Sequence, residues 1–203
     1  MSKRFYGQYD DDHYVWDVSL QQGLVLPQRV LDIGAGNGVR LSNSRAFIEA
    51  GWEAVLVEPN PVSFAELQRE YAGNPRVRCY QLAVGNADGN WCVRVGANPD
   101  HSRVSHDGDG VPVEMVTYRQ LMERTGWLRK PLGLLTVDTE GHDAVILEQM
   151  MGCDPQAWWV IAESLTQHSR RVQLDVMQAD YHLLNILDLN CLWVRRDIAK
   201  WVP

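Results

Sequence analysis

Residues 30–38 read VLDIGAGNG, and this stretch decides the fold. A short apolar strand, Arg29–Ile33, runs into a turn with glycine at three alternate positions. Glycine has no Cβ, so such a turn can adopt positive φ angles and lets a ligand approach the backbone closely. We predict that a helix over Arg40–Ala50 follows the turn and offers free amide donors at its N-terminus. The order strand, glycine turn, helix predicts a ligand-binding edge on an α/β sheet.

The rest of the chain alternates β-branched runs with amphipathic stretches, a pattern typical of βαβ units around a mostly parallel sheet. Five strands are predicted, over Arg29–Ile33, Ala54–Val57, Val77–Ala83, Leu132–Val137 and Ala157–Ala162. Besides the helix named above, we predict helices over Val62–Tyr71, Tyr118–Thr125, Ala144–Met150 and Arg170–Asp180. Residues 181–194 read as two further strands around a turn at Asp188–Asn190. The prediction is a three-layer, Rossmann-like α/β fold with a mostly parallel seven-stranded sheet and a C-terminal antiparallel hairpin.

The sequence contains no repeat or linker, so we expect residues 1–203 to form a single domain. Residues 1–28 read as a helical cover, with Tyr14, Trp16 and Leu20 as packing residues. Residues 96–110 lack apolar periodicity and are rich in turn formers, which is typical of a lid or of a mobile surface loop. His101 and His106 in this loop are candidates for substrate contact.

Composition limits the class of partner. The chain has 19 basic and 26 acidic residues and a formal net charge of −7, which argues against nucleic acid as a partner because binding to phosphates needs clustered cations. No apolar run is long enough for a membrane span, and the N-terminus does not resemble a signal peptide. The four cysteines are widely spaced, as expected for reduced thiols. We therefore expect a cytoplasmic protein that does not bind membranes; its oligomeric state is open.

The details of the glycine turn distinguish between two cofactors. A dinucleotide fingerprint would require a third glycine where Val39 stands, and Asp32 stands at the end of the strand that precedes the turn. Both features favour the methionine moiety of S-adenosylmethionine. Glu58 follows the second strand and can accept hydrogen bonds from both ribose hydroxyls of an adenosine. The predicted cofactor-binding residues are Asp32, Gly34, Ala35, Gly36, Asn37, Gly38, Glu58, Pro59, Ala83 and Asp138.

A second group of acidic residues follows the two strands that should be neighbours. Asp138 and Glu163 end these strands at the same carboxyl edge as the cofactor. Transfer of a methyl group to an alcohol requires removal of the acceptor proton or polarisation of the oxygen. Asp138, Glu140, His142 and Glu163 are therefore the predicted catalytic residues. Alternatively, Asp138 and Glu163 hold a divalent cation such as Mg²⁺ or Mn²⁺. In a purely structural interpretation, Asp138 caps the next helix and Glu140 faces its dipole.

Several motifs together resemble the FkbM family of methyltransferases. They are DIGAGNG, VEPNP at Val57–Pro61, LAVG at Leu82–Gly85, VDTEGHD at Val137–Asp143 and IAES at Ile161–Ser164, and they occur in the family's order between Val30 and Val194. Asp143 stands where the family often has Glu. The resemblance implies a class I fold and methylation of a hydroxyl oxygen on a sugar or small-molecule natural product. Two alternatives are a non-catalytic cofactor- or partner-binding module on the same fold and a nicotinamide-dependent reductase.

Overall fold

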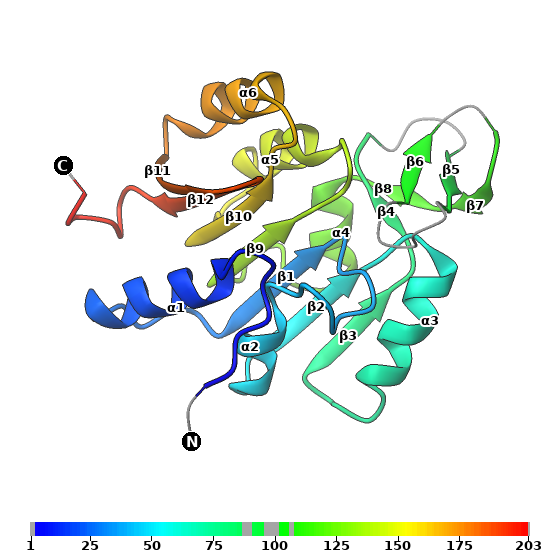
Figure 1. Cartoon of the computed structure of the whole chain (residues 1–203), viewed down its shortest axis with the longest axis horizontal. Coiled ribbons are helices and arrows are strands. Elements are labelled where there is room, and N and C mark those ends of the chain that lie inside the picture. The colour runs from blue at the N-terminus through cyan, green and yellow to red at the C-terminus, as the bar shows by residue number, and fades with distance from the viewer. Residues whose placement is uncertain (1–2, 87–90, 96–101, 106–107, 203) are drawn as a thin grey trace.

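A computed structural model describes residues 3–86, 91–95, 102–105 and 108–202 (Figure 1). The helices are α1 (Asp11–Gln21), α2 (Arg45–Glu49), α3 (Pro61–Glu70), α4 (Tyr118–Arg124), α5 (Asp143–Met151) and α6 (Gln167–Met177). The strands of the large sheet are β1 (Arg29–Ile33), β2 (Glu53–Val57), β3 (Val77–Tyr80), β9 (Leu134–Val137), β10 (Trp159–Glu163), β11 (Tyr181–Leu187) and β12 (Asn190–Arg195). Shorter strands are β4 (Ala83–Val84), β5 (Trp91–Arg94), β6 (Arg103–Ser105), β7 (Val111–Val113) and β8 (Met115–Val116).

The large sheet has the order β11-β12-β10-β9-β1-β2-β3. Its strands from β10 to β3 pair in parallel, whereas β12 is antiparallel to both β10 and β11. The predicted mostly parallel sheet of seven strands with a C-terminal hairpin is therefore confirmed. Ile33 pairs with Val57 on one side and Val137 on the other, so Glu58 and Asp138, the residues after those partners, reach one edge.

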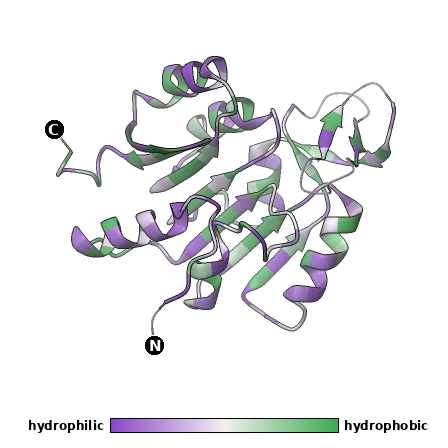
Figure 2. Cartoon of the chain, viewed as in Figure 1, coloured by the Kyte–Doolittle hydropathy of each residue, from purple (hydrophilic) through white to green (hydrophobic). Residues whose placement is uncertain are grey.

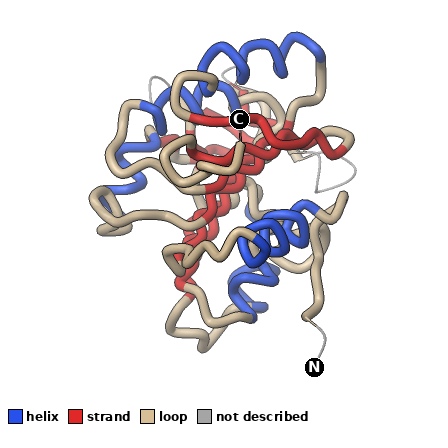
Figure 3. The backbone as a smooth tube through the Cα atoms, turned by 90° about the vertical axis from the view of Figure 1, so that its left-hand side faces the viewer, coloured by secondary structure: helices blue, strands red, loops and turns tan. Residues whose placement is uncertain are grey.

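Two cores lie on opposite faces of the sheet because successive strand residues point in opposite directions. On one face, Ile33 and Val137 pack with side chains of α4, α5 and α6. On the other face, Val30 and Leu56 pack with side chains of α1, α2 and α3. Figure 3 shows helices on both sides of the twisted sheet, and Figure 2 shows hydrophobic residues concentrated in the central strands. The result is the predicted three-layer arrangement.

Some element boundaries differ from the sequence prediction. The helix expected over 40–50 begins only at Arg45 and has five residues, because residues 39–44 form a loop instead. The strand expected over 77–83 is divided into β3 and β4, and β4 pairs with β8 outside the large sheet. Leu20 was expected to pack but is 64% exposed, whereas Tyr14 and Trp16 pack against the core of the α1–α3 face.

A three-stranded sheet of order β6-β5-β7 was not predicted. It lies beside the top of α3 in Figure 1. Its strand β6 falls within the expected lid at residues 96–110, where Arg103 pairs with Arg94 of β5. Residues 96–101 and 106–107, with His101 and His106, lie outside the described part of the chain. Part of the expected lid is thus a strand.

The N-terminal segment is fixed to the end of the C-terminal hairpin. Asp11 at the start of α1 is fully buried, and its carboxylate accepts a hydrogen bond from the Asn190 side chain at 2.7 Å. Asp12, also buried, accepts from the backbone amides of Tyr6 and Gly7. Among the described residues, no helix is both long and apolar enough to cross a membrane. The four cysteines are free thiols.

Burial of Asp11 predicts a pH-dependent cost. Burial raises the pKa of Asp11 from 3.8 to about 6, so the folded state favours the neutral carboxyl. The stability that this group contributes is therefore complete below about pH 4 and is lost as the pH rises through about 6. We expect Asp11→Asn to gain up to about 3 kcal/mol of unfolding free energy relative to wild type between pH 4 and pH 7.5. Urea denaturation at both pH values measures this gain.

The exposed Asp175 on α6 provides the control. Asp175→Asn should change the free energy of unfolding by no more than about 0.5 kcal/mol at pH 7.5, because its side chain is 64% exposed and carries no burial cost. A difference between Asp11→Asn and wild type that does not change with pH would contradict the assignment of this cost to Asp11.

Candidate functional site

A cavity of about 490 Å³ lies at the carboxyl edge of the large sheet. The ends of β1, β2, β9 and β10 form its floor, and residues of the N-terminal segment, β6 and the β11–β12 turn complete its walls. Except for Gly38, the residues predicted for cofactor binding and catalysis line this cavity: Asp32, Gly34, Ala35, Gly36, Asn37, Glu58, Pro59, Ala83, Asp138, Glu140, His142 and Glu163. Sites of this kind are expected outside the carboxyl ends of strands in open α/β sheets.

Gly34 and Gly36 have different roles in the glycine turn: Gly34 is needed for packing of the backbone, and Gly36 faces open space. Gly34 has φ +91°, and a Cβ there would overlap with the backbone carbonyl of Asp138. Gly34 therefore permits two backbone segments, after β1 and after β9, to approach closely. Gly36 has φ +56°, and a Cβ there would meet no atom within 4 Å. Because Gly36 lines the cavity, the space in front of it is available to a ligand.

Gly38 is required by packing within the protein. A Cβ at this position would collide with the side chains of Leu67 and Tyr71 on the α3 side. The Tyr71 hydroxyl also donates a hydrogen bond to the Gly38 carbonyl at 2.8 Å. Within the described part of the chain, Gly38 does not belong to the cavity lining. Its glycine identity thus has a structural explanation that the sequence pattern did not suggest.

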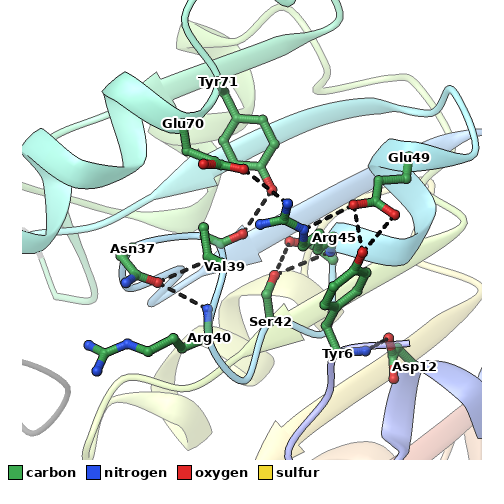
Figure 4. Close-up of polar contacts among 12 residues, drawn as sticks. Tyr6, Asp12, Asn37, Val39, Arg40, Ser42, Arg45, Glu49, Glu70 and Tyr71 are labelled. Atoms are coloured by element: carbon green, nitrogen blue, oxygen red, sulfur yellow. Dashed lines mark hydrogen bonds and ion pairs between the residues drawn. The ribbon is translucent and has the colours of Figure 1, made fainter. Parts of the chain in front are cut away.

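Residues 37–45 form a polar loop in place of the first turns of the predicted helix (Figure 4). The Asn37 side chain accepts hydrogen bonds from the amides of Val39 and Arg40, both at 3.1 Å. Ser42 accepts from the Arg45 amide at 3.2 Å, and the Arg45 guanidinium pairs with Glu49 and Glu70, each at 3.0 Å. The cavity wall beside the glycine turn is therefore a loop fixed by polar contacts, and the predicted helix N-terminus is not there.

Glu58 is a buried acceptor at the end of β2. Its two carboxylate oxygens accept hydrogen bonds at 2.8 Å, one from the Gly36 amide and one from the Asn60 amide. Burial is the largest cause that raises the pKa of Glu58 to about 7; the two amides act against it. Each oxygen has a second lone pair, so the carboxylate can accept further hydrogen bonds from a ligand in the cavity.

Asp32 supports the neighbouring loop from inside β1. It is 3% exposed, and its Oδ2 accepts a hydrogen bond from the Ser44 hydroxyl. Burial raises the pKa of Asp32 to about 6. Asp32 also lines the cavity. Its carboxylate therefore connects β1 to the loop at Ser44 and faces the space that a ligand would occupy.

Three carboxylates converge at the other end of the cavity. One oxygen atom from each of Asp138, Glu140 and Glu163 lies within 4.8 Å of the other two. Two oxygens bound to one Mg²⁺ can be about 4.2 Å apart, because each Mg–O distance is about 2.1 Å. The pairing of β9 with β10 places Asp138 beside Glu163, as predicted. Glu140 joins them, although only Asp138 and Glu163 were predicted as ligands of a cation.

Burial and the neighbouring carboxylates raise the pKa of Glu163. Burial, the charges of Asp138, Asp143 and Glu140, and a hydrogen bond to Asp138 all raise its pKa well above the usual range. Like charges at this distance disfavour full ionisation. The group therefore favours either a shared proton or a bound cation.

The turn that carries Glu140 is held by Asp143. The Asp143 carboxylate accepts hydrogen bonds from the amides of Thr139 and Gly141, at 3.1 and 3.2 Å. Glu140 itself has φ +55°, a left-handed conformation uncommon for a residue with a side chain. The N-cap of α5 is His142 and not Asp138, so the capping role suggested for Asp138 is wrong. The acidic residue that stabilises this turn is Asp143.

Strand β6 and Ser102, the residue before it, are connected to both ends of the cavity. Near Glu58, the Asn60 side chain donates a hydrogen bond to the Ser102 hydroxyl at 2.8 Å. Near the carboxylate cluster, the Arg103 guanidinium lies 3.8 Å from the Glu140 carboxylate. His142, which lines the cavity, contacts the Trp91 ring of β5 edge-on, with centroids 5.3 Å apart. The small sheet thus forms part of the site.

Several residues that line the cavity were not predicted from sequence. They are Gln8, Arg40, Leu41, Ser102, Arg103, Leu165 and Leu189, among others. Ser102 and Arg103 fall within the lid expected over residues 96–110, whereas no local motif marks the others. The Asn-Pro pair at 60–61 did carry a signal, since Asn60 caps α3 and holds Glu58 through its amide.

Comparison with known proteins gives a family for this architecture. Residues 32–190 match the family model described as the methyltransferase FkbM domain. No curated protein matches the sequence.

Solved structures share the fold at low identity. A methyltransferase from Geobacter sulfurreducens is 15% identical, with a TM-score of 0.51 over 91% of this chain and 77% of its own. The protein yhhF of Escherichia coli, provisionally assigned as a methyltransferase, is 13% identical, with a TM-score of 0.52 over 95% and 88%. Monomeric WbdD is 14% identical, with a TM-score of 0.52 over 96% of this chain, which spans 42% of the WbdD chain. These likenesses show a Rossmann-like methyltransferase fold.

The different environments of the two cavity glycines can be tested by stability. Gly34→Ala should lower the free energy of unfolding by about 3 kcal/mol or more, because it forces overlap with the backbone at Asp138 and strains a positive φ. Gly36→Ala should cost only about 1–2 kcal/mol, the strain of a left-handed alanine. Thermal and urea unfolding measure both values.

Gly126 is the matched control, with φ +69° and no atom within 4 Å of an added Cβ. Gly126→Ala should cost as much as Gly36→Ala. If Gly36→Ala were as damaging as Gly34→Ala, Gly36 would not face open space.

Proposed function

Because the chain belongs to the FkbM methyltransferase family, we propose that it transfers the methyl group of S-adenosylmethionine to a hydroxyl oxygen of a sugar or small-molecule natural product. The observation that carries the proposal concerns the two ends of one cavity. Glu58, a buried carboxylate that can accept hydrogen bonds from ribose hydroxyls, lies at one end, and the cluster of three carboxylates lies at the other. The first suits the adenosine of the methyl donor, and the second suits an alcohol.

The residues at the Glu58 end fit the cofactor. The open space in front of Gly36 permits close approach of a ligand to the turn, and Glu58 retains lone pairs for ribose hydroxyls. Ala83, which also lines the cavity, offers little bulk and suits an adenine ring. When bound, S-adenosylmethionine supplies a methyl group activated by its sulfonium.

The order of the strands supports a position for the acceptor. Along the sheet, β2 carries Glu58, β1 the glycine turn, β9 Asp138 and β10 Glu163. A cofactor with its ribose at Glu58 and its methionine part along the glycine turn would direct its methyl group toward Asp138. The acceptor hydroxyl then lies among Asp138, Glu140, His142 and Glu163.

The carboxylates can act on the hydroxyl proton. An alcohol has a pKa far above neutrality and is a weak nucleophile until a base removes its proton. Because its pKa is raised, Glu163 favours the protonated form and keeps the cluster from full ionisation. As a carboxylate, Asp138 would accept the proton of the acceptor hydroxyl while the hydroxyl oxygen forms a bond to the methyl carbon and the carbon–sulfur bond of the donor breaks, leaving a neutral thioether. Glu140 and His142 orient the acceptor beside Asp138.

A second version of the mechanism uses a cation. Asp138, Glu140 and Glu163 could hold a divalent ion, which would polarise the hydroxyl oxygen as a Lewis acid. The hydroxyl donates its proton to solvent or to His142 in that case. In the first version, Asp138 is the base and Glu163 holds a proton. In the second, Asp138, Glu140 and Glu163 are the ligands of a divalent cation.

Glu58 should be needed for binding of the methyl donor. Glu58→Ala should weaken binding of S-adenosylmethionine by about 1.5–3 kcal/mol, the range for hydrogen bonds to a charged group. Isothermal titration calorimetry measures the change. The control is Glu53→Ala at the opposite end of the same strand, where the carboxylate pairs with Arg29. Equal affinities of Glu58→Ala and wild type would place the adenosine elsewhere.

Asp138 should be needed for turnover and not for binding of the donor. Asp138→Asn keeps the size of the side chain and removes its charge, so the rate should fall by at least about 10², the lower end of general-base contributions. Transfer of labelled methyl to the acceptor and calorimetry with S-adenosylmethionine report the two properties. Asp175→Asn on α6 is the control. A wild-type rate in Asp138→Asn would refute both versions of the mechanism.

Chelation separates the two versions. If activity is lost in EDTA and restored by Mg²⁺ or Mn²⁺, the cluster holds a cation; if activity is unaffected, Asp138 acts as a base. Binding of S-adenosylmethionine with no transfer to any acceptor would instead indicate a non-catalytic module on the same fold.

A further inference from the structure

Three leucines line the cavity although much of their surface is exposed. Leu41 is 53% exposed and Leu165 is 42% exposed, and Leu189 is half-buried. They come from three different segments: the loop after the glycine turn, the loop after β10 and the β11–β12 turn. Scattered exposed leucines need no explanation, but several gathered around one cavity mark a surface that contacts a ligand.

Leu165 and Leu189 lie at the acceptor end. Leu165 is two residues beyond Glu163, and the amide of Ser164 donates a hydrogen bond to the Leu189 carbonyl at 2.7 Å. This bond joins the two loops next to the carboxylate cluster. Strands β9 and β1 separate them from β2, which carries Glu58. The two side chains are therefore placed to contact the acceptor and not the adenosine.

Leu41 is held in an unfavourable conformation. Its φ is +56°, in the left-handed region, where a branched side chain is strained. The loop fixes it from both sides, through Asn37, which binds the amides of Val39 and Arg40, and through Ser42, which binds the Arg45 amide (Figure 4). Strained residues of this kind persist where the surrounding structure determines them, and they cluster at ligand sites.

We propose that the acceptor is a molecule with an apolar body, aliphatic or aromatic, which Leu41, Leu165 and Leu189 contact while its hydroxyl reaches Asp138. This inference rests on the proposed methyl transfer and narrows its substrate. An unsubstituted sugar has small C–H faces but carries hydroxyls around its whole rim, so it offers too little hydrocarbon to contact leucines from three separate segments. A sugar could be an acceptor only if it carries a hydrocarbon substituent.

A fluorescent apolar probe tests the proposal without knowledge of the natural acceptor. N-phenyl-1-naphthylamine, which is neutral and fluoresces in apolar surroundings, is titrated into the protein saturated with S-adenosylhomocysteine. The wild-type protein should bind the probe with saturable enhancement. The double variant Leu165→Asn/Leu189→Asn should bind at least about tenfold more weakly, because two leucine contacts are lost.

The matched control is Val62→Asn/Ile186→Asn. These two side chains are 52% and 38% exposed and are not part of the cavity lining in the described part of the chain. This variant should bind the probe as wild type does. No saturable binding by the wild type, or an equal loss in both double variants, would overturn the proposal. Thermal melts of all variants identify any that fail to fold.

A pair of glucosides tests the chemistry of the ligand. Octyl β-D-glucoside and methyl β-D-glucoside have the same sugar hydroxyls and differ only in the alkyl chain. Octyl glucoside, below the concentration at which it forms micelles, should displace the probe, and methyl glucoside at the same concentration should not. Equal displacement, or displacement by neither, would contradict an apolar site.

The strain at Leu41 gives an independent readout. Leu41→Gly should weaken binding of the probe while leaving the melting temperature unchanged or higher, because glycine accepts the left-handed conformation. Asp188→Gly, with φ +52° outside the cavity lining, controls for the conformational effect. Unchanged binding in Leu41→Gly would exclude Leu41 from the site. Calorimetry with S-adenosylmethionine is done separately on the wild type: absence of binding there defeats the proposed function, whatever the probe shows.

Discussion

The structure depends on one close approach of two backbone segments. The turn after β1 and the end of β9 meet where Gly34 faces the carbonyl of Asp138. The Asp138 amide donates a hydrogen bond to the Ile33 carbonyl at 2.9 Å. A side chain at position 34 would force these segments apart. Because they stay together, the glycine turn and the acidic box share one edge of the sheet. The two halves of the reaction, donor and acceptor, can then occupy one cavity.

Negative charge dominates that cavity. Asp32, Glu58, Asp138, Glu140 and Glu163 all line it. Burial raises the pKa of Asp32 to about 6 and that of Glu58 to about 7, so these carboxyls are held where ionisation is costly. A cationic methyl donor would offset part of this cost, whereas its neutral product would not. The arrangement that suits the chemistry is therefore a source of instability in the free protein, a common cost of functional sites.

The walls of the cavity come from parts of the chain far apart in sequence. The N-terminal segment brings Gln8, strand β6 brings Arg103, and the C-terminal hairpin brings Leu189. Polar contacts between distant segments join these parts to one another and to the sheet: Asp11 to Asn190, Arg103 to Glu140, and Ser102 to Asn60. A core of parallel strands thus supports a rim that is built from segments far apart in the sequence.

The sequence by itself determined the sheet, the glycine turn, Glu58 and the acidic box at Asp138, because these depend on local periodicity and on residues next to strand ends. Parallel pairing brings all strand ends to one edge, so their convergence also followed from sequence. Only the tertiary structure decided that Gly38 packs against Tyr71, that α2 begins at Arg45, that Asp143 holds the turn and that Glu140 joins the carboxylate cluster. It alone placed β6 and the leucines at the cavity. Those features arise from contacts between distant segments, whose energies leave no local pattern in the chain.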